Sequence, residues 1–186
     1  MLTGCLSGPK SEDWLAVGFR TPEQTFRTFQ TGLRAGLPDL EYRCFSSGFK
    51  SGASSGDPGF TQTLYREFRS ELFRRKPWLQ LAAKARIQET QPVGRDRVRV
   101  LAKVDTWFHD ETFAVDFVRE DYYELWVDGK RVADDSLAWP RMASAKGGEL
   151  TVRVPLPPDL HLEAIGELRA GSEWKIDGFP LQDSGP

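Results

Sequence analysis

The hydrophobic period of this chain changes once, near Ala83, and that change constrains the fold more than any other feature. Before Ala83, apolar residues recur three, four and seven positions apart, as they do on one face of a helix. After Ala83, they alternate with polar residues, as they do along a strand. Helices followed by consecutive strands favour an α+β fold, with helices on one face of an antiparallel sheet, over a doubly wound sheet.

The helical part contains a clear start signal. Thr21, Pro22 and Gln24 occupy the N-cap, the first and the third position of a helix and form a capping box. Gly36 supplies the stop. The predicted segments are a first helix from Thr21 to Gly36, a second from Asp39 to Phe45, a Ser/Gly-rich loop over 46–60 and a third helix from about Thr61 to Arg75.

The second part of the chain predicts short antiparallel strands. Asp128-Gly129 is a tight-turn dipeptide, Ala170-Gly171-Ser172 predicts a hairpin turn, and 134–148 reads as a loop. The predicted strands are Lys84–Gln91, Arg97–Asp105, Thr112–Arg119, Asp121–Val127, Leu150–Val154, Leu160–Arg169 and Glu173–Gly178.

Alternation along these strands assigns their two faces. The inward sets are Val98, Val100, Ala102, Val104; Phe113, Val115, Phe117; Tyr123, Leu125, Val127; and Leu160, Leu162, Ala164, Leu168. They contain no Asp, Glu or His. Because a general base inside a cavity would interrupt this apolar face, the sequence predicts no catalytic base between helices and sheet.

Candidate site residues lie at three other places. Asp105 and His109 would line a pocket mouth at a strand end. Tyr42, Tyr65 and Tyr123 would offer hydroxyls inside a pocket, with ordinary core packing as the alternative. Apolar residues on the outer sheet face would form a dimer or partner surface, with a solvated sheet as the alternative. These outer residues are Leu101, Tyr122, Trp126 and Ile165.

The extreme N-terminus carries the strongest localisation signal. Leu2-Thr3-Gly4-Cys5 resembles the lipobox at which bacterial lipoproteins are lipidated on cysteine, and a polar tether follows up to Asp13. Lipidation of Cys5 would hold the domain at a bacterial membrane, outside the cytoplasm. The alternative is a cytoplasmic protein with a chance Cys5. Cys44 lies on an apolar helical stripe and predicts a buried thiol.

Composition excludes several classes of function. With 25 Lys+Arg against 27 Asp+Glu, the net charge of -2 leaves no basic excess for nucleic acid. The sequence has no apolar run near 18 residues that could span a membrane. Two Cys without CxxC spacing, and two His, predict neither a metal site nor a cofactor. Gly52-Ala53-Ser54-Ser55-Gly56 formally matches a nucleophile elbow but lacks the strand, helix and histidine of that motif.

The helical start and the last strand together resemble the nuclear-transport-factor-2-like superfamily, also called the cystatin-like roll. The resemblance rests on the capped helix Thr21–Phe29, the second helix through Tyr42-Arg43-Cys44-Phe45 and the closing strand Glu173–Phe179. It implies a cone-shaped roll in which a curved sheet wraps the first helix. It implies one domain over 14–181, after the N-terminal segment 1–13 and before a tail over 182–186.

Members of this superfamily include enzymes, small-ligand binders and catalytically silent modules. The polar pocket residues of its enzymes have no match in this sequence. We therefore expect a non-catalytic, lipid-anchored domain that binds a small ligand or protein at the cell envelope, with membrane contact through Cys5. The alternative is a small isomerase or cyclase that uses Asp105 and His109.

Overall fold

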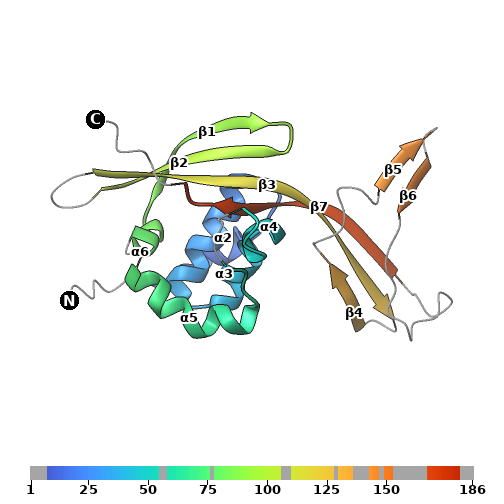
Figure 1. The fold of residues 1–186 in the computed structure, drawn as a ribbon, viewed down its shortest axis with the longest axis horizontal. Coiled ribbons are helices and arrows are strands. Elements are labelled where there is room, and N and C mark those ends of the chain that lie inside the picture. Colours follow the sequence, from blue (N-terminus) through green and yellow to red (C-terminus); the bar gives the residue numbers. More distant parts are fainter. Residues whose placement is uncertain are drawn as a thin grey trace. The chain divides into compact units, whose positions relative to one another are not determined.

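The fold is taken from a computed structural model, which describes residues 8–54, 58–75, 78–105, 110–127, 130–135, 143–146, 149–152 and 167–180 (Figure 1). These residues pack as two units. One comprises residues 1–118 and 174–186, and the other comprises residues 119–173. Strands β3 and β7 contribute residues to both units, and each unit is described separately.

In the described residues of the first unit, six helices precede the strands. Their bounds are α1 Ser11–Leu15, α2 Pro22–Ala35, α3 Pro38–Cys44, α4 Ser47–Lys50, α5 Gln62–Arg75 and α6 Trp78–Ala82. The predicted N-cap of α2 is confirmed, because Thr21 Oγ1 accepts from the Gln24 amide at 3.1 Å. The reciprocal half of the predicted capping box differs, because the Gln24 side chain accepts from the Arg20 amide, at 3.0 Å, and not from the Thr21 amide. Gly36 ends α2 in the left-handed conformation, at a φ of 64°. The short helices α1, α4 and α6 were not predicted, because segments of four or five residues show no clear period.

The sheet of the first unit is antiparallel. Strand β1 (Arg86–Gly94) pairs with β2 (Arg97–Asp105), β2 pairs with the first part of β3 (Asp110–Val127), and β7 (Glu167–Gly178) pairs with β3. The helices pack on this four-stranded sheet, so the predicted α+β class is confirmed. Among the residues that the structure describes, the sheet is not closed into a barrel.

The core lies between α2 and the sheet. The predicted inward residues Val100, Ala102 and Val104 are buried, as are Val115 and Phe117 of β3. Facing them are Phe26 and Phe29 of α2, which are fully or almost fully buried. Cys44 is also buried, as predicted, and burial raises the pKa of its thiol. The strict alternation of β2 and β3 therefore determined which of their faces meets the helices.

Two chain segments from the helical part cover the backbone of β7. The Trp174 amide donates to the Phe19 carbonyl at 2.7 Å, and the Ser46 amide donates to the Ile176 carbonyl at 2.8 Å. Phe45 and Ile176 form a parallel β-bridge. These contacts satisfy backbone groups of a strand that would otherwise present them to solvent. They also bring residues 45–54 next to the last strand.

In the second unit, β3 pairs antiparallel with β4 (Lys130–Asp135), and β5 (Ala143–Lys146) pairs with β6 (Glu149–Val152). Three sequence predictions about strand boundaries are wrong. The predicted break at Glu120 and the hairpin turn at 170–172 both lie inside continuous strands, β3 and β7, and the predicted loop over 134–148 contains β5. Pairing of β3 with β7 satisfies the backbone there and overrides the local turn preference. Ser172 donates a hydrogen bond to Asp121 across this pair.

Candidate functional site

A surface groove lies between α1, α2 and the segment that joins α6 to β1. It has a volume of about 480 Å³. The residues that line it are Glu12, Asp13 and Ala16 of the α1 region, Arg27, Gln30, Thr31 and Arg34 of α2, and Ala83, Lys84 and Ala85. We call this hollow the α1–α2 groove. Charged side chains from three segments that are separate in sequence therefore surround one open volume.

Two sets of contacts fix the walls of the α1–α2 groove. Arg34 forms an ion pair with Asp13 at 2.8 Å and so joins α2 to α1. On the opposite wall, the Gln30 side-chain amide donates to the carbonyl oxygens of Ala82 and Ala85, both at 2.8 Å. The groove is thus formed by bonded elements and needs no rearrangement to exist.

The charges in the α1–α2 groove are not all neutralised by one another. Hydrogen bonding from the Lys10 backbone amide lowers the pKa of Asp13, and Arg34 lowers it further. Asp13 therefore stays ionised and is matched by Arg34. The other charged residues that line the groove, Arg27, Lys84 and Glu12, are all exposed, and Arg27 also interacts with Glu23 of α2. An open groove with this mixture of groups suits a polar, partly anionic ligand.

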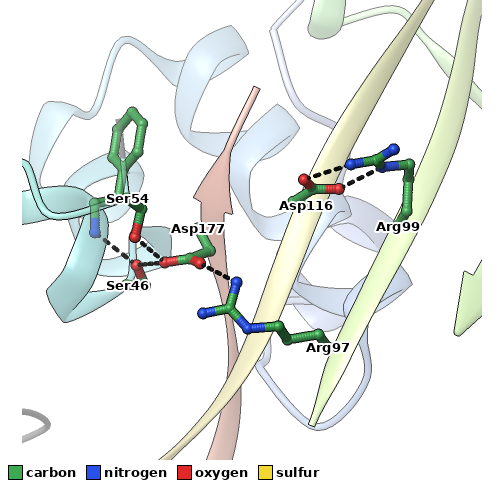
Figure 2. A network of polar contacts seen from close by, with 7 residues as sticks. Ser46, Ser54, Arg97, Arg99, Asp116 and Asp177 are labelled. Carbon is green, nitrogen blue, oxygen red and sulfur yellow. Dashed lines mark hydrogen bonds and ion pairs between the residues drawn. The ribbon is translucent and has the colours of Figure 1, made fainter. Parts of the chain in front are cut away.

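A second cluster of polar residues surrounds Asp177 on β7 (Figure 2). Its Oδ1 accepts hydrogen bonds from the hydroxyls of Ser46 and Ser54, both at 2.6 Å. Its Oδ2 lies 3.0 Å from Nη1 of Arg97, which reaches over β3 from β2. Asp177 is almost fully buried, so these donors replace water around its charge.

The same cluster contains the serine at the centre of the Gly52–Gly56 pattern. Ser54 is exposed and donates to Asp177. Three donors of the protein itself bond to the Asp177 carboxylate: the hydroxyls of Ser46 and Ser54 and the guanidinium of Arg97. A Cβ at Gly48 would lie 2.5 Å from Ser54 Oγ, so a side chain there would displace the Ser54 hydroxyl. The geometry assigns the cluster to holding residues 46–54 on β7.

Asp177→Asn is expected to lower the free energy of unfolding by about 2 kcal/mol. The variant removes a charged acceptor from two serine hydroxyls and from Arg97, and hydrogen bonds to charged groups contribute about 1.5–3 kcal/mol. Chemical denaturation followed by circular dichroism measures this change, and hydrogen exchange should become faster in residues 46–54.

The matched control is Asp116→Asn. Asp116 forms a two-pronged ion pair with Arg99 on the same sheet, at 2.6 and 2.9 Å, but both side chains are about one-third exposed (Figure 2). We expect a loss below about 1 kcal/mol. An equal loss of unfolding free energy in the two variants would contradict the assignment of Asp177 to holding residues 46–54 on β7.

A third polar cluster is centred on Glu41 of α3. Its carboxylate accepts from the Tyr65 hydroxyl at 2.7 Å and from two nitrogens of Arg69 at 2.6 and 2.7 Å. Glu41 is completely buried. Burial raises the pKa of the Tyr65 phenol, and the Glu41 charge raises it further. Burial alone would lower the pKa of Arg69, but its bonds to Glu41 outweigh this and raise it. Tyr65 and Arg69 therefore both stay protonated as donors.

The predicted pocket residues lie in different surroundings. Tyr65 is buried and bonded to Glu41, and its ring contacts Tyr42 at 6.2 Å between centroids. The Tyr42 hydroxyl donates to the Phe60 carbonyl at 3.5 Å. Asp105 is 57% exposed at the end of β2, 3.7 Å from Arg86 and 4.0 Å from Lys103. A ligand role for these residues stays a prediction.

Several other predicted residues lie outside the described part of the structure. Cys5, His109 and Ile165 are among them, and the side chains of Tyr122, Tyr123 and Trp126 on β3 are not described. Leu101 is half-buried on the outer sheet face, where it pairs with Ala114 of β3. Its role as an interface residue stays a prediction.

Sequence reasoning missed the buried charges of the first unit. Glu41, Lys175 and Asp177 are all buried, and none of them belongs to the inward strand faces that the sequence predicted to be free of acids. One usable signal is Gly32 inside α2, because a Cβ there would lie 2.9 Å from Glu41 Cγ. Lys175 packs its ammonium 4.1 Å from the ring centroid of Phe19 and donates to the Arg43 carbonyl at 3.0 Å.

Two further classes of site are absent from the described residues. Within these ranges, no three His, Cys, Asp or Glu side chains come together closely enough to hold a metal ion. None of the described helices combines the length and the apolar character needed to cross a bilayer. Comparison of the chain with known proteins finds no matching family, no similar curated protein and no similar solved structure.

Proposed function

We propose that this chain is a non-catalytic binding domain of the bacterial cell envelope, anchored by lipid on Cys5, which binds a polar ligand or a partner segment in the α1–α2 groove. The observation that carries the binding part is the open, charged α1–α2 groove next to an aromatic core. Aromatic rings contact one another throughout the space between α2, α3, α5 and β7. The groove of about 480 Å³ lies outside this packed core.

The non-catalytic part of the proposal rests on how the buried carboxylates are used. Glu41 and Asp177 each accept three hydrogen bonds from residues of the protein itself. A general base needs a lone pair that can reach a substrate proton. Asp105, the acid of the alternative enzyme, is more than half exposed and therefore lacks the desolvated setting that tunes such a base.

The anchoring part rests on the Leu2-Thr3-Gly4-Cys5 motif and the polar segment that follows it. Two or three acyl chains would exceed the hydrophobic energy of a single chain, which binds membranes only reversibly. We also propose that the domain belongs to the nuclear-transport-factor-2-like superfamily. The order of helices before an antiparallel sheet, and the contact of residues 45–46 with the last strand, support this assignment.

The test is mass spectrometry of the chain produced in a bacterial host from its own gene, with any in-frame codons upstream of Met1. We expect a mature chain that begins at Cys5, carries acyl mass and partitions into membranes. The Cys5→Ser variant should carry no acyl mass and should not partition into membranes. Native mass spectra of the detergent-extracted protein should show a bound ligand that an Arg27→Glu, Lys84→Glu variant loses. An unmodified chain that retains Met1 would refute the anchor.

A further inference from the structure

Helix α1 exposes two large apolar side chains next to each other. Trp14 is 45% exposed and Leu15 is 87% exposed. Single apolar residues on a surface are common, but an adjacent tryptophan and leucine on one short helix form a small apolar protrusion. Their exposure in a folded segment needs an explanation.

The protrusion belongs to a fixed part of the first unit. The Asp13–Arg34 ion pair ties α1 to α2, and Asp13 Oδ2 accepts from the Lys10 amide at 2.7 Å at the start of α1. Behind α1, the Ala16 and Val17 amides bond to the carbonyls of Glu12 and Trp14. Trp14 and Leu15 are therefore presented outward by a bonded helix.

The distance along the chain places this protrusion close to the proposed anchor. The segment from Cys5 to Ser11 spans at most about 20 Å when fully extended. A lipid on Cys5 would thus keep α1 within about 20 Å of the bilayer surface, at a high effective concentration. Tryptophan prefers the membrane–water interface, where its ring is buried and its N–H stays hydrated.

The charges around α1 favour the same partner. Lys10 precedes the helix, and Arg27 and Lys84 line the groove beside it; all three are exposed. Asp13 is matched by Arg34 and Glu23 interacts with Arg27, which leaves Lys10 and Lys84 against Glu12. Anionic lipid headgroups attract such a surface.

We infer that Trp14 and Leu15 insert into the interface of the bilayer that carries lipidated Cys5, as a second membrane contact that orients the domain. This inference rests on the anchor in the proposed function. One lipid on a tether leaves a domain free to rotate, whereas a second contact on α1 fixes which face meets the membrane. The α1–α2 groove, which α1 lines, would then lie near the bilayer surface.

The test uses the full chain coupled through the Cys5 thiol to a maleimide lipid in vesicles of phosphatidylglycerol and phosphatidylethanolamine. Cys44 is buried and does not compete for the maleimide. Vesicles with brominated acyl chains should quench the tryptophan fluorescence of the coupled protein. Trp14→Phe should remove most of this quenching, and Leu15→Ser should reduce it at least twofold.

Trp174→Phe is the matched control, because Trp174 packs against the core of the first unit. It should leave the quenching by brominated lipid unchanged. Absence of quenching in the coupled wild-type chain, or quenching that Trp14→Phe leaves intact, would overturn the inference. Chemical coupling supplies the anchor, so these results do not depend on whether the host lipidates Cys5. Lipidation in the host tests the proposed function, and the quenching experiment tests only the contact through Trp14 and Leu15.

Discussion

Phe45→Ala is expected to lower the free energy of unfolding of the first unit by about 3–5 kcal/mol, as large-to-small changes of buried aromatic residues do. Phe45 is almost fully buried at the end of α3, and it forms the β-bridge to Ile176 of β7. Its ring lies between 5.0 and 6.5 Å, centroid to centroid, from five others: Phe29, Phe49, Phe60, Tyr65 and Phe179.

The size of this effect follows from the position of the ring. The side chain at 45 joins α2, α4, α5 and the residue after β7, so none of these elements alone can move to fill the cavity. Urea denaturation followed by circular dichroism measures the loss. Leu64→Ala on α5 is the control, because Leu64 is 43% exposed and should cost less than about 0.5 kcal/mol. A loss below 1 kcal/mol for Phe45→Ala would show that the aromatic cluster is loosely packed.

Removal of either partner of the Glu41–Arg69 ion pair is the second large effect. We expect Glu41→Ala to cost about 3 kcal/mol and Arg69→Ala to cost about 4–5 kcal/mol, because breaking a buried pair leaves an uncompensated charge. Arg69 is 22% exposed and can turn its guanidinium toward water when Glu41 is removed. Glu41 is completely buried and cannot turn its carboxylate toward water. The free energy of unfolding should therefore fall further in Arg69→Ala than in Glu41→Ala.

A double-mutant cycle in urea measures the coupling between the two residues. The exposed pair Arg66–Asp39 is the matched control on the same two helices, with a similar two-pronged geometry at 2.6 Å. Because Asp39 is about half exposed, we expect Asp39→Ala to cost less than 1 kcal/mol. A loss of unfolding free energy in Arg69→Ala no larger than that in Glu41→Ala would contradict this prediction. It would show that water reaches the Glu41 carboxylate in the Arg69→Ala variant.

In the described residues of the first unit, the buried carboxylates Glu41 and Asp177 connect elements that are distant in sequence. Glu41 ties α3 to α5, and Asp177 ties residues 46–54 to β7. Each carboxylate accepts hydrogen bonds from elements that are distant in sequence, and these bonds hold the elements together. The proposed function therefore places ligand binding in the α1–α2 groove, outside these two buried clusters.

Local sequence determined much of the helical part and the inner sheet face. The Thr21 cap, the Gly36 stop and the alternation along β2 and β3 each depend on residues within a few positions of one another. Helix capping and the burial of one strand face both act within a single helix or strand. Each of these features is present in the structure as predicted.

Features that depend on distant partners could not be predicted in this way. The hydrogen bonds of Asp177 join residues 123 and 131 positions apart, and those of Arg69 with Glu41 join residues 28 apart. The continuous course of β7 through Gly171 depends on pairing with β3. The local pattern at Ala170-Gly171-Ser172 favours a turn, and only the partner strand decides against it.

The sequence by itself determined that helices precede strands, the inward face of the central strands and the burial of Cys44, because periodicity and capping are local properties. Only the tertiary structure decided which charges are buried, that β3 and β7 run unbroken, and where the surface is hollow. A carboxylate becomes buried when donors from other elements compensate its lost hydration, and those donors become neighbours only when the chain has folded.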